Sequence, residues 1–274
     1  MAVKTMQAFL EAVRVGSALF SFLYASWSDY KTREVSNSVW ILFAPPAFAL
    51  TFSELLLFNL SALPFFGLCF GLTAAFAIIL FYAGGFGGAD AKALMCLALA
   101  LPFHPQELFS TPLSGEISPF MQRFFPLTVF SNAVILAALT AVYLLIHNFV
   151  RRWRTGRALF EGEQKTEAVS KKILVLLTGY KVSIGKVKEK WHLYPLEDVE
   201  KTENGVKRKL VVFPKDEGRN AIVERLEAAF KNGEIQEKIW ATPGLPMLVF
   251  MTVGLVIALL YGDIVWNFVR FLLG

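Results

Sequence analysis

The chain has 274 residues, of which 55% are apolar and 18% charged, and its formal net charge is +5. This composition is too apolar for an ordinary soluble domain of this length. The excess apolar surface must face something other than a buried core, and we expect that partner to be a lipid bilayer.

Segments long enough to cross a hydrocarbon layer of roughly 30 Å need about 20 apolar residues each. Five such segments occur at 8–28, 37–58, 62–83, 124–149 and 243–272. A sixth segment, 90–103, is shorter and carries Asp90 and Lys92 at its start. No small-residue cleavage site follows the first segment, so we expect it to be retained as a helix. The pattern predicts an α-helical polytopic membrane protein with six transmembrane helices.

A few charged residues lie inside these expected helices. Glu11 and Arg14 are three residues apart, a spacing that lets them pair on one helix face. Glu54 and Asp263 fall in the outer parts of their helices, where we expect them to be interfacial anchors.

Residues 151–240 form a polar insert that must lie outside the membrane. They hold 20 of the 27 Lys and Arg residues against 14 Asp and Glu, a net charge of +6. The pattern predicts a small α+β domain with an apolar stretch at 168–178 and a helix at 219–231. Between them, alternating segments at Trp191–Val199 and Lys207–Phe213 flank a turn containing Asn204-Gly205, which is typical of a hairpin. We expect the chain to divide into a membrane domain at 1–150, this domain, and a sixth helix within 241–274.

The short loops predict the orientation. With six helices, one side of the membrane carries the basic residues Lys31, Arg33, Lys92 and Arg151-Arg152-Trp153-Arg154, whereas the other has Lys4, no basic residue in the turn near 59–62, and only Arg123 in the 104–123 loop. Because the more basic side is normally cytoplasmic, we expect both termini outside and the insert in the cytosol. A basic insert on that side is also expected to contact anionic lipid.

Two aspartates lie at the cytoplasmic ends of these helices. Asp29 closes the first helix, and Asp90 opens the fourth after a glycine-rich turn that leaves room for an extended peptide. Helices that pack at the spacing of a helical bundle could let carboxyls at these two positions face a single catalytic volume. Two plainer interpretations stay open: Asp29 as an interfacial charge paired with Lys31 or Arg33, and Asp90 as an acid at a helix N-terminus.

These motifs resemble the type IV prepilin peptidase superfamily of GxGD membrane aspartyl proteases, and its archaeal preflagellin peptidases most closely. The resemblance is carried by Asp-x-x-x-x-x-Val-x-Asn at Asp29 to Asn37 and by Gly-Gly-Ala-Asp-Ala-Lys at Gly87 to Lys92. It also covers the insert before a last helix that begins Trp240-Ala-Thr-Pro-Gly-Leu-Pro and ends Tyr-Gly-Asp263. Ala89 departs from the glycine that the family usually has before the second aspartate.

The resemblance implies that Asp29 and Asp90 are the catalytic pair, and that Gly87, Gly88, Lys92 and Asn37 shape the site or bind substrate. Lys92 has the alternative of extending to the membrane interface. The implied activity is removal of the short leader of archaellin or type IV pilin-like precursors at the cytoplasmic membrane face. Neither a cofactor nor a nucleic-acid partner is expected.

Metal binding is not expected, because Cys69 and Cys96 lie in predicted helices with no cysteine pair or histidine cluster near them.

Two rival functions would use the same two aspartates. A protease of the presenilin and signal-peptide-peptidase kind is disfavoured because Ser28 precedes Asp29 and the Pro-Ala-Leu motif is absent. An ion-coupled transporter is disfavoured because the sequence shows neither repeat symmetry nor charged broken helices at the midplane.

Overall fold

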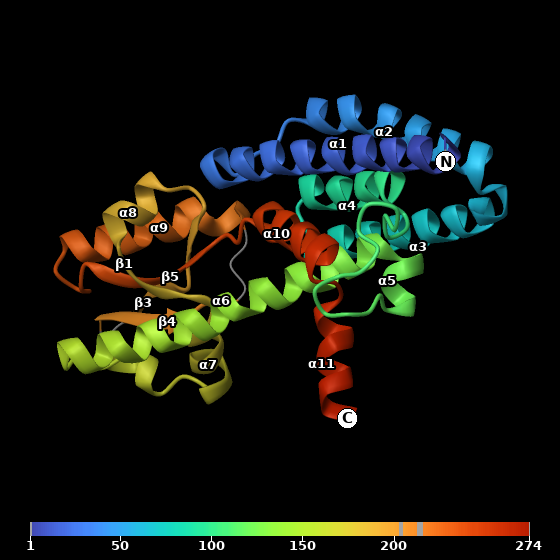
Figure 1. The fold of residues 1–274 in the computed structure, drawn as a ribbon. Coiled ribbons are helices and arrows are strands. Elements are labelled where there is room, and N and C mark those ends of the chain that lie inside the picture. Colours follow the sequence, from blue (N-terminus) through green and yellow to red (C-terminus); the bar gives the residue numbers. More distant parts are fainter. Residues whose placement is uncertain (1, 203–204, 213–215, 274) are drawn as a thin grey trace. The chain divides into compact units, whose positions relative to one another are not determined.

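A computed structural model describes residues 2–202, 205–212 and 216–273 (Figure 1). The chain divides into two compact units. The second unit is Ala138–Leu245, and the first contains the residues before it together with those from Pro246 onward.

The first unit is helical. Its elements are α1 (Ala2–Thr32), α2 (Asn37–Phe58), the 3-10 turn η1 (Leu60–Ala62), α3 (Leu63–Tyr82), α4 (Gly88–Ala100), α5 (Pro119–Arg123), α10 (Met247–Leu260) and α11 (Ile264–Leu273). Helix α6 (Phe125–Thr155) begins in this unit and continues into the second. The short helix α4 is the centre of the packing, because α1, α2, α3 and α10 all contact it.

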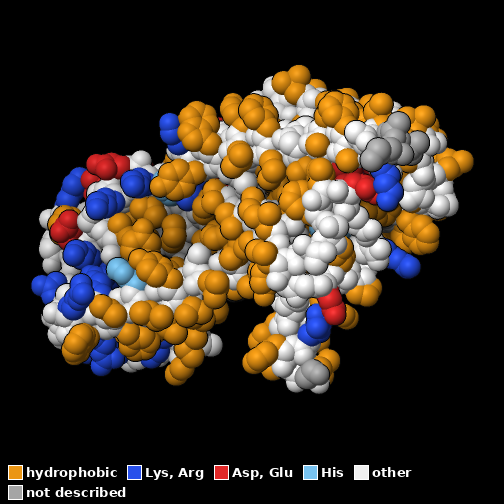
Figure 2. Space-filling view, viewed as in Figure 1, with side chains coloured by type: hydrophobic (Ala, Val, Ile, Leu, Met, Phe, Trp, Pro, Cys, Tyr) orange, Lys and Arg blue, Asp and Glu red, His pale blue; other side chains and the backbone are white. Residues whose placement is uncertain are grey.

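Among the described residues, four helices are long and apolar enough to cross a membrane, namely Lys4–Thr32, Asn37–Phe58, Leu60–Tyr82 and Phe125–Thr155. Helices α10 and α11 pass the same criterion together, but they are bent by 58° at a short break, so they count as a fifth span only if the pair is one. Figure 2 shows the apolar side chains that cover much of the first unit's surface. These features are those of a membrane protein.

Two of the six expected helices differ from continuous spans. With 13 residues, α4 is about 20 Å long, too short to cross the hydrocarbon layer alone. The segment expected at 243–272 begins with the end of a strand and continues as the broken pair α10 and α11.

The C-terminal end of α4 lies inside the protein, and its last carbonyl is paired there. The Ala100 carbonyl accepts hydrogen bonds from Arg14 Nη1 at 3.2 Å and from Thr51 Oγ1 at 3.0 Å. Leu101, the next residue, is fully buried. Backbone that leaves a helix within a membrane protein is tolerated where the protein supplies such partners, so a short α4 is compatible with a bilayer.

The charged residues of α1 and α2 have different roles from those predicted. Arg14 forms its ion pair with Glu54 at 2.7 Å, and both side chains are buried. Glu11 instead accepts the backbone N–H groups of Glu107 and Leu108 at 3.0 and 3.2 Å. The prediction that Glu54 is an interfacial anchor is therefore wrong, because a charge pair buried between helices is a tertiary contact.

The break between α10 and α11 is held by side chains. Asn132 donates to the Gly262 carbonyl at 3.0 Å and accepts the Ile264 N–H at 3.1 Å. Asp263, also expected to be an interfacial anchor, is buried, accepts the Ser118 hydroxyl at 2.9 Å and caps α11 through the Trp266 N–H. These hydrogen bonds account for the burial of the Asp263 carboxyl, which serves to cap a helix.

The second unit combines short helices with two small sheets. Its elements are η2 (Gly162–Lys165), α7 (Val169–Thr178), β1 (Tyr180–Ser183), α8 (Ile184–Glu189), β2 (Leu193–Pro195), β3 (Glu197–Thr202), β4 (Gly205–Leu210), α9 (Asp216–Lys231) and β5 (Lys238–Pro243). One antiparallel sheet has the order β1-β5-β2, and β3 pairs with β4 in the other.

The predicted hairpin exists in shortened form. Strands β3 and β4 are antiparallel neighbours, but Leu193–Pro195 pairs with β5 in the other sheet instead of extending the hairpin. Asn204 and Phe213, which belonged to the predicted turn and strand end, lie outside the described residues. The expected helix at 219–231 is α9, which begins at Asp216.

Candidate active site

Asp29 lies in the last turn of α1 and is half-buried. Its Oδ2 is a buried oxygen without a hydrogen-bond partner. The chain leaves the helix just beyond it, where Arg33 adopts a left-handed backbone with a φ of 57°. The hydroxyl groups of Ser28 and Thr32 both donate to the Glu34 carbonyl, at 2.7 and 3.0 Å, and so fix the turn that follows.

The N-terminal end of α10 packs beside this turn of α1. Ser26 donates to the Leu248 carbonyl at 2.9 Å, and Thr252 donates to the Phe22 carbonyl at 3.1 Å. The Leu248 backbone N–H interacts with the Asp29 carboxyl, as does the Arg33 guanidinium. Asp29 therefore faces a helix N-terminus and a cation, both of which favour negative charge.

Asp90 is the third residue of α4 and is half-buried. Its Oδ2 accepts the Gly87 backbone N–H at 3.0 Å, and the Ala91 N–H donates to the Gly87 carbonyl. The Asp90 carboxyl thus makes the acid's half of a capping box with the N-cap residue Gly87, which has no side chain to make the other half. Oδ2 of Asp90 therefore has the helix-capping role of the plainer interpretation, and Oδ1 does not take part in this bond.

The structure brings the two aspartates to the same end of the first unit. Helices α1 and α4 contact each other, Asp29 lies in the last turn of α1, and Asp90 lies in the first turn of α4. The Asp29 and Asp90 carboxyls are close enough to interact electrostatically. Two sequence motifs separated by a helical hairpin therefore contribute to one polar site.

A hydrogen bond ties the two motifs together. Lys92 Nζ donates to Asn37 Oδ1 at 2.6 Å, joining the first residue of α2 to the second turn of α4. Lys92 therefore engages the other motif, whereas the sequence left it the alternative of extending to the interface. This bond fixes the segment after Asp29 against the helix that carries Asp90.

The glycines before Asp90 have unequal roles. Gly84 has a φ of +75°, a conformation that L side chains rarely adopt. A Cβ atom on Gly87 would lie 3.1 Å from Asp90 Oδ2, whereas one on Gly88 would lie 3.6 Å from the Phe81 ring, an ordinary contact. Gly87 therefore admits the close approach of the Asp90 carboxyl, and Gly88 does not control it.

Sequence reasoning overlooked the contribution of α10 to this site. Leu248 and Thr252 are apolar or weakly polar members of a hydrophobic helix, and nothing in their spacing distinguishes them. Arg33 was considered only as a surface partner of Asp29, although its positive φ, invisible in the sequence, sets its position. Among the described residues, no group of three or more His, Cys, Asp or Glu side chains is placed to hold a metal ion.

Comparison with known proteins shows similarity to two peptidase families. Residues 17–147, which include both aspartates and Gly87, match the type IV leader peptidase family. Residues 171–264 match the archaeal peptidase A24 C-terminus of type II. The chain is therefore similar to leader peptidases over these two ranges. The resemblance that the sequence motifs predicted is thereby confirmed, and it extends to peptidase families in both units.

Three curated relatives cover most of the chain. A preflagellin peptidase from Methanococcus voltae is 29% identical over 89% of this chain and 93% of its own length. One from Methanococcus maripaludis is 23% identical over 90% and 94%, and one from Methanocaldococcus jannaschii is 24% identical over 88% and 90%. The similarity extends through the second unit as well as the helices.

Proposed function

We propose that this chain is an aspartyl endopeptidase that removes the short N-terminal leader of archaellin or type IV pilin-like precursors. The observation that carries the proposal is the convergence of Asp29 and Asp90 at one end of the helical unit. The family and the preflagellin peptidase relatives support a protease and a precursor substrate of this kind.

In the proposed mechanism the two carboxyls share one proton, because like charges a few ångströms apart do not both ionise cheaply. One carboxylate acts as general base and takes a proton from the attacking water. The other, protonated, donates a hydrogen bond to the scissile carbonyl. Because coupled acids titrate as a pair, the mechanism assigns both roles to the dyad and not to one residue.

The surroundings of the dyad fit an extended peptide. The turn before α4 contains Gly84, Gly85, Gly87 and Gly88, and Gly85 and Gly87 are exposed. A turn without side chains leaves space for a peptide backbone beside Asp90. Lys92 and Asn37, bonded to each other, hold the two sides of this space at a fixed separation.

For the arrangement in the membrane, we propose that the dyad and the second unit face the cytosol and that both termini lie outside. This topology needs six crossings, with α4 as a short crossing buried among its neighbours and α10 with α11 as the last. The excess of Lys and Arg on the dyad's side supports it. A basic leader followed by an apolar helix would reach the dyad from that side.

The test of the function is co-expression with a candidate archaellin or pilin-like precursor, followed by N-terminal sequencing of the product. The proposal predicts a single cut between the basic leader and the apolar helix of the precursor. A precursor that keeps its leader in the presence of folded, membrane-inserted protein would contradict this function. An uptake assay in liposomes tests the transporter alternative, for which we expect no ion flux.

A further inference from the structure

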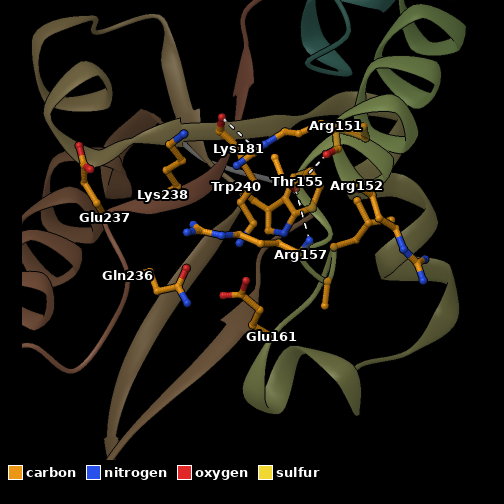
Figure 3. Close-up of a pocket in the computed structure, with 13 residues that line it drawn as sticks. Arg151, Arg152, Thr155, Arg157, Glu161, Lys181, Gln236, Glu237, Lys238 and Trp240 are labelled. Atoms are coloured by element: carbon orange, nitrogen blue, oxygen red, sulfur yellow. Dashed lines mark hydrogen bonds between the residues drawn. The ribbon is translucent and has the colours of Figure 1, made fainter.

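A cavity lined by polar residues lies within the second unit. It has a volume of about 550 Å³, within the range of ligand sites. Its walls come from the last turns of α6, from the segment after them, from β1, and from β5 with the residues before it. Figure 3 shows Arg151, Lys181, Lys238 and Arg157 placed around Trp240.

The cavity has an excess of positive charge. Its basic residues are Arg151, Arg152, Arg157, Lys181 and Lys238, and its acidic residues are Glu161 and Glu237. In the part of the chain that the structure describes, no carboxylate lies within 4.0 Å of any of these five cations. Glu161 has its nearest cation in Arg208, at 4.0 Å. Among the described residues, these five cations therefore form no direct ion pair, although Glu161 and Glu197 lie close enough to interact with Lys181 electrostatically.

The interior of the cavity is built around Lys181 and the Trp240 ring. Lys181 Nζ lies 5.4 Å from the ring centroid, a cation–π contact, and Trp240 is fully buried. The indole N–H of Trp240 has no hydrogen-bond partner. Burial lowers the pKa of Lys181; the charges of Glu197 and Glu161 oppose this shift, and those of Arg208 and Arg151 add to it. A bound anion would relieve this cost, because it neutralises the ammonium group where water is excluded.

The cavity lies at the C-terminal end of α6, and this position indicates which kind of anion could reach it. At 31 residues α6 is about 46 Å long, which exceeds the hydrocarbon thickness of roughly 30 Å. Arg151, Arg152 and Thr155 occupy its last turns, at the level of lipid headgroups when the apolar part spans the bilayer. Trp153, 86% exposed in the same turns, is the type of residue that marks a membrane interface.

We propose that this cavity binds the phosphate of an anionic membrane lipid headgroup through Arg151, Arg157 and Lys181. Guanidinium groups bind phosphate oxygens with two parallel N–H donors, and Lys adds a point charge. The Arg157 guanidinium extends across the cavity toward Gln236 and Lys238, whereas Arg152 points away from Trp240 (Figure 3). The lipid then anchors the second unit to the surface of the membrane from which α6 emerges.

The test is lipid binding to the full chain in a neutral detergent. Short-chain phosphatidylglycerol, short-chain phosphatidylcholine and inorganic phosphate are titrated separately, with native mass spectrometry or the shift in melting temperature as readout. We expect saturable binding of phosphatidylglycerol that weakens with added salt. Binding of phosphatidylcholine or inorganic phosphate of equal affinity would overturn a site for anionic lipid.

Substitutions of the cavity residues test whether the lipid phosphate binds there. Arg157→Gln, at an exposed position, and Arg151→Gln/Lys181→Gln are expected to weaken phosphatidylglycerol binding by about tenfold or more, because each removes a charge-assisted hydrogen bond. Lys231→Gln on α9 removes the same charge outside the cavity and is the matched control. Unchanged affinity in Arg157→Gln, or an equal loss in Lys231→Gln, would overturn the proposal; an unchanged lipid-free melting temperature shows that Arg157→Gln is folded.

Discussion

Lys92 on α4 donates a 2.6 Å hydrogen bond to Asn37 at the start of α2, and this contact joins the two halves of the aspartate site. The bond spans 55 positions of sequence. It holds the turn that follows Asp29 beside the helix that begins with Asp90. The separation of the two carboxyls therefore depends on a polar contact as well as on helix packing.

Removal of this contact is expected to lower activity without unfolding the protein. Lys92→Met keeps most of the apolar stem, and Asn37→Ala removes the acceptor. Each is expected to lower kcat/KM by roughly tenfold, since the bond contributes about 1.5 kcal/mol. Cleavage of a precursor in detergent measures the effect.

A double-mutant cycle tests whether the two residues act together. The variant with both changes is expected to be no slower than the slower single variant, because the second change removes nothing further. Lys31→Met, an exposed lysine at the same end of the unit, is the control and is expected to cleave normally. Additive losses would show that Lys92 and Asn37 act separately.

Substitution of Gly87 and of Gly88 by alanine is expected to have different effects on activity. Gly87→Ala places a Cβ 3.1 Å from Asp90 Oδ2, and the carboxyl must rotate away at a cost of about 1 kcal/mol. We expect kcat/KM to fall by roughly fivefold. Gly88→Ala, whose Cβ makes an ordinary 3.6 Å contact, is the matched control and is expected to retain activity. Equal losses in both would show that the Gly87 contact does not position Asp90.

Removal of either partner of the buried ion pair between Arg14 on α1 and Glu54 on α2 is expected to lower the stability of the protein. Arg14→Met leaves Glu54 buried without its partner and removes a donor from the Ala100 carbonyl, so we expect a loss of about 3 kcal/mol. Glu54→Gln retains a hydrogen-bonding group, and the loss is expected to be smaller. Thermal unfolding of the detergent-solubilised chain measures both. An Arg14→Met variant as stable as the parent would show that the pair does not support α4.

The pH dependence of the second unit is expected to include Glu167. Its hydrogen bond from Lys171 lowers its pKa, as does the Leu210 N–H. A carboxyl with a lowered pKa stabilises the fold fully above its unfolded pKa of about 4.3, and this stability is lost as the pH falls through the folded pKa. Glu167→Gln is expected to cost roughly 1 kcal/mol at pH 7 and nothing in acid.

Hydrogen exchange of the Leu210 amide in the full chain measures this difference at each pH, relative to the parent protein. Glu163→Gln, at an exposed position of η2, is the control and is expected to leave exchange unchanged. A difference of the same size at pH 7 and at pH 3.5 would contradict the role of the Glu167 charge.

Much of the helical unit was predictable because hydropathy determines which segments are long enough to span a membrane. The sequence indicated that Asp29 and Asp90 lie at the same end, since each terminates or begins a helix and the intervening hairpin returns the chain. It did not indicate the bend between α10 and α11. That bend depends on Gly262 with a φ of +108° and on Asn132, which is 130 residues away.

The errors have a common physical cause. Local spacing showed that Glu11 and Arg14 could pair, and they do interact electrostatically, but the sequence could not show that the direct ion pair of Arg14 is with Glu54 on another helix. Alternating hydrophobicity correctly indicated strands near Leu193 but could not name the partner strand, which is β5. Partner choice in both cases is a tertiary property.

The central claim is that Asp29 and Asp90 form one catalytic dyad, and the most direct measurement is precursor cleavage by the purified Asp29→Asn and Asp90→Asn variants. Both are expected to retain the parent's melting behaviour and to lose cleavage entirely, since asparagine can neither accept nor donate the shared proton. Glu34→Gln, which removes an exposed carboxylate five residues from Asp29, is expected to cleave normally. Cleavage near the parent rate by either aspartate variant would contradict the dyad.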